Sequence, residues 1–391
     1  MSKVPAGWEL KSLGEVAELQ RGFDLPAKDR VDGNIPIISS GGYSGFHNEP
    51  RATSPGIVTG RYGSIGDVYF IEEDFWPLNT SLWVKNFHGN EPKYLYYLLS
   101  SIDYKKFSDK TGVPGVNRND LHAIKVFVPP YKEQTKIAQI LSTWDKAIAT
   151  TEKLIGNSQQ QKKTLMQSLL TGKKRLPGFE GEWLSEELGS LGETYSGLTG
   201  KTKEDFGSGY PYISYMNVYK NTEINIDFSE KVNIGPKENQ YRVSYGDIFF
   251  TTSSETPEEV GMSSVLLSHI EDTYLNSFCF GYRLFTFEKV LPEFCKFVFR
   301  GDEMRRKISK LAQGATRYNL SKKRLMLLRI VLPPLPEQQK IAAVLTAADN
   351  EIELLQKKLA FLKQEKAALM QQLLTGKRRV KIHTTEECMD A

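Results

Sequence analysis

The feature that most constrains the fold of this chain is an internal repeat. Residues 129–138 (PPYKEQTKIA) recur at 333–342 (PPLPEQQKIA), at an offset of 204 (129 to 333). The same register carries 165–173 (LMQSLLTGK) onto 369–377 (LMQQLLTGK). Nearly half of the positions in this gapless alignment are identical, so the chain contains two copies of one element.

A second repeat precedes the first, at an offset of 175 (8 to 183). It pairs Trp8, Leu13, Gly14, Gly22, Pro36, Ile38 and Ser39 with Trp183, Leu188, Gly189, Gly197, Pro211, Ile213 and Ser214. Because the two offsets differ, the second half has about 29 additional residues after this opening. The order is therefore variable domain, common segment, variable domain, common segment, which we place at 1–130, 131–175, 176–334 and 335–380, with a tail at 381–391.

The common segment is predicted to be a long helix. Its two prolines end a short strand (124–128 and 328–332), and a helix then begins near Lys132 and Pro336. Apolar residues follow at heptad spacing in both copies: Ile137, Leu141, Trp144, Ile148, Ile155, Leu165 and Leu169, then Ile341, Leu345, Ile352, Leu355, Leu359, Leu362, Leu369 and Leu373. Lys366 interrupts the second seam, and polar residues weaken the middle of the first. Gly172 and Gly376 are predicted to be left-handed C-caps.

A helix of about 38 residues extends roughly 57 Å and is unstable alone with an exposed apolar seam. The obvious partner is its own repeat, which predicts an antiparallel coiled coil of the two helices. The alternative is that each seam packs only on its own domain. The expected fold class is α+β, with two pseudo-repeated α/β domains separated by two long, antiparallel helices.

The variable domains have the pattern of short strands bounded by Gly, Ser and Asn. Predicted strands lie at 35–38, 56–59, 68–71, 82–84 and 247–250. Predicted helices lie at 92–99 and 292–310.

Composition places the chain among ordinary globular proteins. The net charge of +4 permits nucleic-acid binding without requiring it. No apolar run reaches the roughly 20 residues of a membrane-spanning helix, and the first residues lack the apolar core of a signal peptide. The cysteines at 279, 295 and 388 suit neither a disulfide framework nor a zinc site, so we expect a reducing, cytoplasmic setting.

Several catalytic motifs are approached but not completed. The stretch 197–202 (GLTGKT) has two residues between its glycines where a phosphate-binding loop needs four. The stretch 128–131 (VPPY) has valine where adenine methyltransferases have a polar residue that bonds the base. Asp74, Glu91 and Lys93 only loosely imitate a metal-dependent nuclease site. The histidines have no metal-ligand spacing: His47, His88, His122, His269 and His383. We predict no catalytic residue and no metal site.

The arrangement resembles the specificity (S) subunits of type I restriction–modification systems over nearly the whole chain. The most specific motif is the PPxxEQxKIA start joined to the LLTGK end, present twice. The opening at 7–15 (GWELKSLGE), the loop at 60–66 (GRYGSIG) and the second opening at 181–189 are also similar to the family's target recognition domains. The second domain departs from the pattern at 251–255 (TTSSE).

The resemblance implies a non-catalytic, DNA-binding subunit. Each target recognition domain would recognise one half of a bipartite, asymmetric site in double-stranded DNA. The paired helices would set the spacer and dock two methyltransferase (M) subunits, and motor/nuclease (R) subunits would join that core. S-adenosylmethionine, ATP and magnesium would belong to these partners, in a complex that is a DNA adenine methyltransferase and ATP-dependent endonuclease. The alternatives are a restriction or methylation enzyme with an undetected active site, or a coiled-coil scaffold for proteins.

Candidate DNA contacts are loop residues that carry Arg, Lys, amide or hydroxyl groups, since Arg can bind guanine and Asn adenine by two hydrogen bonds. In the first domain they are Ser39, Ser40, Tyr43, Arg61, Tyr62, Ser64, Asn117 and Arg118. In the second they are Tyr215, Asn217, Thr252, Ser253, Arg317, Tyr318 and Lys322. The alternative role for each is that of an ordinary loop residue that caps a strand or turn.

Overall fold

The computed structural model describes residues 4–108, 115–227 and 230–382. The chain forms two compact units, Met1–Lys153 with Lys357–Ala391, and Leu154–Gln356. Each unit therefore combines one variable domain with half of each long helix, a division that crosses the sequence-based boundaries. No helix among the described residues is long and apolar enough to cross a membrane.

The two common segments are long helices, α4 (Tyr131–Leu169) and α10 (Leu335–Leu374). Each begins one residue earlier than predicted, directly after the proline pair. The glutamine of the repeated motif anchors this start: Gln134 donates to the carbonyl of Pro129 at 2.9 Å, and Gln338 to that of Pro333 at 2.8 Å. Past the other ends, Gly172 (φ 70°) and Gly376 (φ 69°) have the predicted left-handed backbone.

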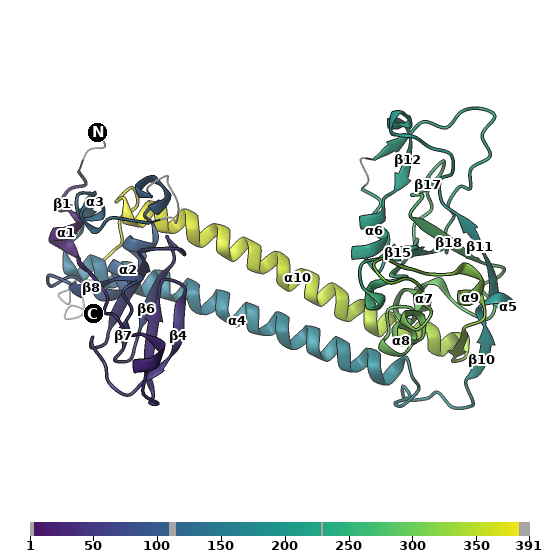
Figure 1. The fold of residues 1–391 in the computed structure, drawn as a ribbon, viewed down its shortest axis with the longest axis horizontal. Coiled ribbons are helices and arrows are strands. Elements are labelled where there is room, and N and C mark those ends of the chain that lie inside the picture. Colours follow the sequence, from purple (N-terminus) through teal and green to yellow (C-terminus); the bar gives the residue numbers. More distant parts are fainter. Residues whose placement is uncertain (1–3, 109–114, 228–229, 383–391) are drawn as a thin grey trace, which may run out of the picture. The chain divides into compact units, whose positions relative to one another are not determined.

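The helices pair antiparallel within each unit (Figure 1). In the first unit, partners run in opposite directions along the two helices: Asp145 with Lys366, and Glu152 with Lys363. In the second unit the pairs are Ser158 with Glu351 and Lys162 with Asp349. The predicted antiparallel pairing is therefore found in both units.

The predicted seam is the protected side of both helices. Its outer positions are buried, and every other predicted seam residue is half-buried; the buried ones are Ile137, Leu141, Leu169, Ile341, Leu345 and Leu373. Two off-seam apolar residues of α10 are exposed, Leu354 at 66% and Phe361 at 59%. Burial along the two helices therefore follows the predicted heptad spacing.

The two variable domains share one sheet topology. The first has an antiparallel sheet in the order β2 (Glu18–Arg21), β8 (Ser81–Asn86), β5 (Gly56–Gly60), β6 (Val68–Ile71). The second has the same order in β11 (Gly192–Ser196), β18 (Cys279–Leu284), β14 (Ile248–Thr251), β16 (Ser263–Val265). The repeat seen in sequence is therefore a repeat of fold.

Smaller sheets repeat as well. In the first domain β4 (Gly42–His47), β3 (Ile35–Ser39) and β7 (Trp76–Pro77) form a sheet whose β3–β7 pair is parallel, and β1 (Glu9–Ser12) pairs with β9 (Lys125–Val128). The second has β13 (Lys231–Val232), β12 (Phe206–Ile213) and β17 (Tyr274–Leu275), with β12–β17 parallel, and β10 (Leu184–Glu187) paired with β20 (Arg329–Leu332). It adds β15 (Ser253–Ser254) with β19 (Tyr318–Asn319).

Short helices complete the domains. The first domain has α1 (Leu13–Val16), α2 (Pro92–Ser100), α3 (Arg118–His122) and the 3₁₀ turns η1 (Ala27–Asp29) and η2 (Tyr104–Phe107). The second has α5 (Leu188–Leu191), α6 (Tyr215–Lys220), α7 (Pro292–Val298), α8 (Asp302–Ser309), α9 (Lys322–Met326), η3 (Lys203–Asp205) and η4 (Pro257–Glu259).

The prediction of one helix over 292–310 is wrong, because Gly301 divides α7 from α8. Gly301 has extended backbone (ψ 145°) as the N-cap of α8. A Cβ at Gly301 would lie 3.1 Å from Leu170, so the break occurs where α4 packs closely against the domain. The half-buried guanidinium of Arg300 donates to the carbonyls at the end of α6, including those of Val218 and Tyr219.

The core of each domain continues into the helix pair. In the first unit, Tyr94 and Tyr97 of α2 pack in one cluster with Leu141 of α4 and Leu373 of α10. The second unit has the equivalent cluster around Phe294 and Phe297 of α7. Where each long helix meets a domain, its seam therefore packs both on the other long helix and on the domain. The two alternatives from the sequence, pairing of the helices and packing on the domain, are both found there.

Candidate nucleic-acid interface

Three loops of the first domain converge near Thr80. The hydroxyl of Thr80 accepts a hydrogen bond from the backbone N–H of Ser40 at 3.3 Å, and its carbonyl accepts one from that of Arg61 at 2.9 Å. The carbonyl of Arg61 in turn accepts from Val116 at 2.9 Å, next to α3. This network joins the three segments that hold all eight predicted contacts of this domain: Ser39, Ser40, Tyr43, Arg61, Tyr62, Ser64, Asn117 and Arg118.

A cavity of about 350 Å³ lies among these loops. Four predicted residues line it, namely Arg61, Tyr62, Asn117 and Arg118. Two polar residues that the sequence did not indicate also line it, Arg21 and Asn119. Arg21 was missed because it ends strand β2 outside the Gly- and Ser-rich loops.

Arg61 is held in place by its neighbour. Its guanidinium carbon lies 4.5 Å from the centroid of the Tyr62 ring, a cation–π contact. That ring lies directly over Gly115, where a Cβ would be only 2.7 Å from it. A guanidinium stacked in this way keeps its planar fork oriented while its N–H groups can still reach a ligand.

Some predicted contacts already have structural partners. The side chain of Asn117 accepts from the backbone N–H of Asn119 at 2.9 Å as the N-cap of α3. The hydroxyl of Ser39 donates to the carbonyl of Gly42 at 3.0 Å. These bonds match the alternative role of a turn or cap, and DNA contact by either residue stays a prediction.

The second domain has an equivalent site with different side chains. The backbone N–H of Leu320 donates to the carbonyl of Thr252 at 2.9 Å, as that of Val116 does to Arg61. Ser321 caps α9 as Asn117 caps α3, so Lys322 takes the position of Arg118. Arg61 and Arg118 of the first domain thus correspond to Thr252 and Lys322 of the second.

Lys322 is drawn inward. Its ammonium nitrogen donates to the hydroxyl of Ser196 at 2.8 Å and lies 5.6 Å from the centroid of the Phe280 ring. Burial lowers the pKa of Lys322 below its ordinary value. This site therefore offers hydroxyls and one amine where the first domain offers guanidinium groups.

The remaining predicted contacts of the second domain differ in access. The Tyr215 hydroxyl donates to the carbonyl of Ser253 at 3.0 Å, and Ser253 itself is buried. Arg317 is exposed, beside half-buried Tyr318. The amide of Asn217 is engaged in bonds with Asn221 and Asn225 that close the loop after α6.

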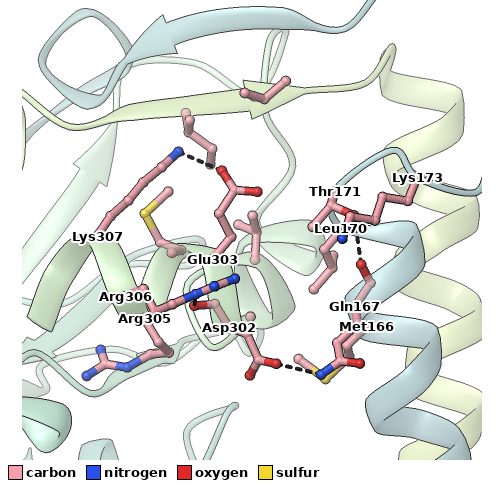
Figure 2. A pocket seen from close by; sticks show the side chains of 15 residues that line it. Met166, Gln167, Leu170, Thr171, Lys173, Asp302, Glu303, Arg305, Arg306 and Lys307 are labelled. Carbon is pink, nitrogen blue, oxygen red and sulfur yellow. Dashed lines mark hydrogen bonds and ion pairs between the residues drawn. The ribbon is translucent and has the colours of Figure 1, made fainter.

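A further cavity of about 650 Å³ lies in the second unit between the end of α4 and α8. Figure 2 shows Gln167 of α4 donating to Asp302 at the start of α8, at 2.7 Å. Glu303 is paired with Lys307 at 2.8 Å. The carboxylates of this cavity therefore already have partners.

The described residues contain no group of three His, Cys, Asp or Glu side chains placed to hold a metal ion. Burial raises the pKa of both Cys279 and Cys295 well above the ordinary thiol value. Cys388 and His383 lie outside the described residues.

The comparisons with known proteins fit this duplicated architecture. The chain matches the family described as "Type I restriction modification DNA specificity domain" twice, over residues 5–157 and 180–364. The chain belongs to this family. It is a specificity subunit of a type I restriction–modification system with two recognition domains, each match joining one domain to the start of its long helix.

Named relatives carry the same description. The specificity subunit is 29% identical to the type I restriction enzyme MjaVIII specificity subunit of Methanocaldococcus jannaschii, with 97% of this chain and 95% of the relative covered. It is 28% identical to the putative MjaX specificity subunit of the same organism, with 97% and 96% covered.

Solved structures share the fold. The S subunit of a type I system from M. genitalium matches with a TM-score of 0.61 at 15% identity, covering 98% of each chain. A structure titled for complex assembly and conformational transition of the type I system matches with a TM-score of 0.61 at 17% identity, covering 97% of this specificity subunit and all of that chain.

Proposed function

We propose that each recognition domain reads one half of a bipartite, asymmetric DNA site. The observation that carries this proposal is that one framework position holds different chemistry in the two domains. Arg61 and Arg118 in the first correspond to Thr252 and Lys322 in the second. Two copies of one fold with different side chains at the same place are suited to two different sequences, because base edges are distinguished by their donors and acceptors.

The paired helices set the spacer between the half-sites. Support comes from their length, 39 residues for α4 and 40 for α10. A straight helix of that size is about 60 Å long, enough to bridge successive major grooves on one face of DNA, about 34 Å apart.

The same helices dock two methyltransferase subunits, and motor/nuclease subunits join that core in the cytoplasm. The specificity subunit contributes recognition and no catalytic group. S-adenosylmethionine, ATP and magnesium are bound by the partners, and the assembled complex is a DNA adenine methyltransferase and ATP-dependent endonuclease. Support comes from family membership and from the likeness to a solved structure that concerns complex assembly in a type I system.

The spacer is tested by inserting seven residues after Lys153 and seven after Lys357, the equivalent position of the other repeat. One heptad preserves the seam and adds about 10.5 Å to each helix. The assembled complex should then select half-sites separated by about three more base pairs, with both half-site sequences unchanged. An unchanged spacer would refute this role of the helices. Insertion into one helix only, the control, should break the pairing.

The absence of catalysis is tested separately. The pure chain is incubated with DNA and either magnesium or S-adenosylmethionine, and DNA cleavage and methyl transfer are measured. Neither is expected of the chain alone, because methyl transfer should require the methyltransferase subunits and cleavage should require the motor/nuclease subunits as well. Cleavage or methylation by the chain alone would identify an enzyme instead. If the assembled complex showed no salt-dependent DNA binding, a protein scaffold would be favoured.

A further inference from the structure

We propose that Arg21 recognises a guanine in the half-site of the first domain. This inference rests on the proposed function and deepens it, since it names the base that one residue reads. Arg21 is the last residue of β2 and lines the 350 Å³ cavity together with Arg61 and Arg118.

Arg21 is oriented by a carboxylate. Its Nη2 donates to both oxygens of Asp24, at 3.1 and 3.3 Å. The amide of Asn79 donates to the same carboxylate and so fixes Asp24 in turn. Both charged side chains are more than half exposed, so the ion pair adds little stability. Its main consequence is to hold the guanidinium plane.

The orientation leaves donors for a ligand. A guanidinium has five N–H groups, and no described residue bonds to those on Nε and Nη1 of Arg21. A phosphate can be bound by a flexible cation, with no fixed orientation of the side chain. Two hydrogen bonds to O6 and N7 of guanine require a planar fork held at a set angle. Arg61, stacked on Tyr62, is a second guanidinium held by a neighbouring side chain in the same cavity.

The second domain shows what replaces this arrangement. Ser196 ends β11 at the position where Arg21 ends β2. Its hydroxyl accepts a hydrogen bond from Lys322, so that site has no guanidinium fork. The guanine contact proposed for Arg21 therefore has no equivalent at this position of the second domain.

The test is selection of a randomised duplex library by the full chain assembled with its methyltransferase subunits. The wild type should select a two-part site with a guanine in one half. Arg21→Ala should lower the preference for that guanine by about 10- to 100-fold. The other half-site should be unchanged. Arg21→Lys, which keeps the charge and loses the fork, should lose most of the same preference.

Two further variants anchor the interpretation. Lys322→Ala should alter selection only in the opposite half, which assigns the halves to the domains. Arg51→Ala, an exposed arginine of the first domain that stacks on Trp76 outside the cavity, should leave both halves unchanged.

Other outcomes overturn the proposal. A uniform loss of affinity for all sequences in Arg21→Ala, with a shallower salt dependence, would identify a phosphate contact instead. A first half-site without guanine would also overturn it while leaving the proposed function intact. A wild-type complex that selects no two-part site would overturn both.

Discussion

Lys366 forms an ion pair with Asp145 across the helix pair of the first unit. The pair is tied to the recognition domain by Tyr97, whose hydroxyl donates to Asp145 at 2.6 Å and whose ring centroid lies 5.2 Å from Lys366 Nζ. Lys366 is the residue that interrupts the apolar seam. A polar residue in an apolar seam fixes the register of the two helices when the other helix offers its ion-pair partner at a single position.

The second unit repeats this arrangement at the equivalent positions of the repeat. Lys162 pairs with Asp349, and Lys162 Nζ lies 5.7 Å from the centroid of the Phe297 ring. Phe297 occupies the place of Tyr97 but has no hydroxyl. One oxygen of Asp349, Oδ2, is accordingly buried without a hydrogen-bond partner.

The Lys162–Asp349 pair is predicted to tolerate reversal of its charges. Asp349→Lys alone places two cations together and should cost about 1–3 kcal/mol of unfolding free energy, measured by calorimetry of the full chain. Adding Lys162→Asp should recover most of that loss. The matched control is the exposed Lys363–Glu152 pair, where Glu152→Lys should cost less than about 1 kcal/mol. Equal effects at both pairs would show that the seam pair does not fix the register.

Tyr97 donates a hydrogen bond to Asp145, whereas Phe297 cannot donate one to Asp349. Exchanging the two aromatic residues should therefore move that hydrogen bond from the first unit to the second. Tyr97→Phe removes a donor from Asp145 and should destabilise the first unit by about 1 kcal/mol. Phe297→Tyr supplies a donor beside Asp349 Oδ2 and should raise the melting temperature of the second unit. A Tyr97→Phe variant as stable as the wild type would contradict this account.

Local patterns sufficed to predict much of this fold. The proline pair, the heptad seam and Gly172 and Gly376 predicted the long helices, because these features act within a few residues of the chain. That the two long helices pair with each other followed from the repeat. The break at Gly301 was missed because its cause is tertiary: Leu170, directly after α4, packs against that glycine.

The candidate site was predictable only in part. Arg61 and Arg118 could be chosen from loops rich in Gly and Asn, and they do line one cavity. Arg21 joins them through the sheet, because β2 ends beside those loops, and its own neighbourhood in sequence gives no such signal. The burial of Ser253 is likewise set by its strand pairing with Asn319, which the sequence does not show.

The buried carboxylate of Glu337 is predicted to be a principal stabilising contact of the second unit. Its side chain is fully buried and accepts hydrogen bonds from Arg175 Nε and Nη2, both at 2.6 Å, and from the indole of Trp183 at 3.3 Å. Glu337→Ala leaves these donors unpaired and should cost about 3–5 kcal/mol.

Glu133 holds the equivalent place in the first unit, with Arg379 and Trp8 as its partners. Glu133→Ala should therefore have an effect of similar size. Glu187→Ala, which breaks an exposed pair with Arg329, is the matched control and should cost less than about 1 kcal/mol. If Glu337→Ala cost no more than Glu187→Ala in thermal unfolding, the buried carboxylate would not hold this unit together.

His122 is predicted to make the first unit less stable in mild acid. Its Nε2 accepts a hydrogen bond from the backbone N–H of Leu19 at 2.9 Å, which requires the neutral ring. Burial, with a contribution from Arg118, lowers the pKa of His122 below its ordinary value of 6.5. The unfolded chain therefore binds the proton more readily than the folded one. Stability is fully present above pH 6.5 and falls as the pH drops toward the folded-state pKa.

The measurement is the melting temperature of the first unit at pH 8 and at pH 5.5. The wild type should lose more stability between these values than His122→Gln, whose amide oxygen can accept the same hydrogen bond at both. The carboxylates titrate equally in the two proteins, so the difference isolates the imidazole. A protonated His122 cannot keep this bond, because Leu19 N–H and the protonated ring would then be two facing donors. Identical pH dependence in the wild type and the variant would therefore contradict the role assigned to His122.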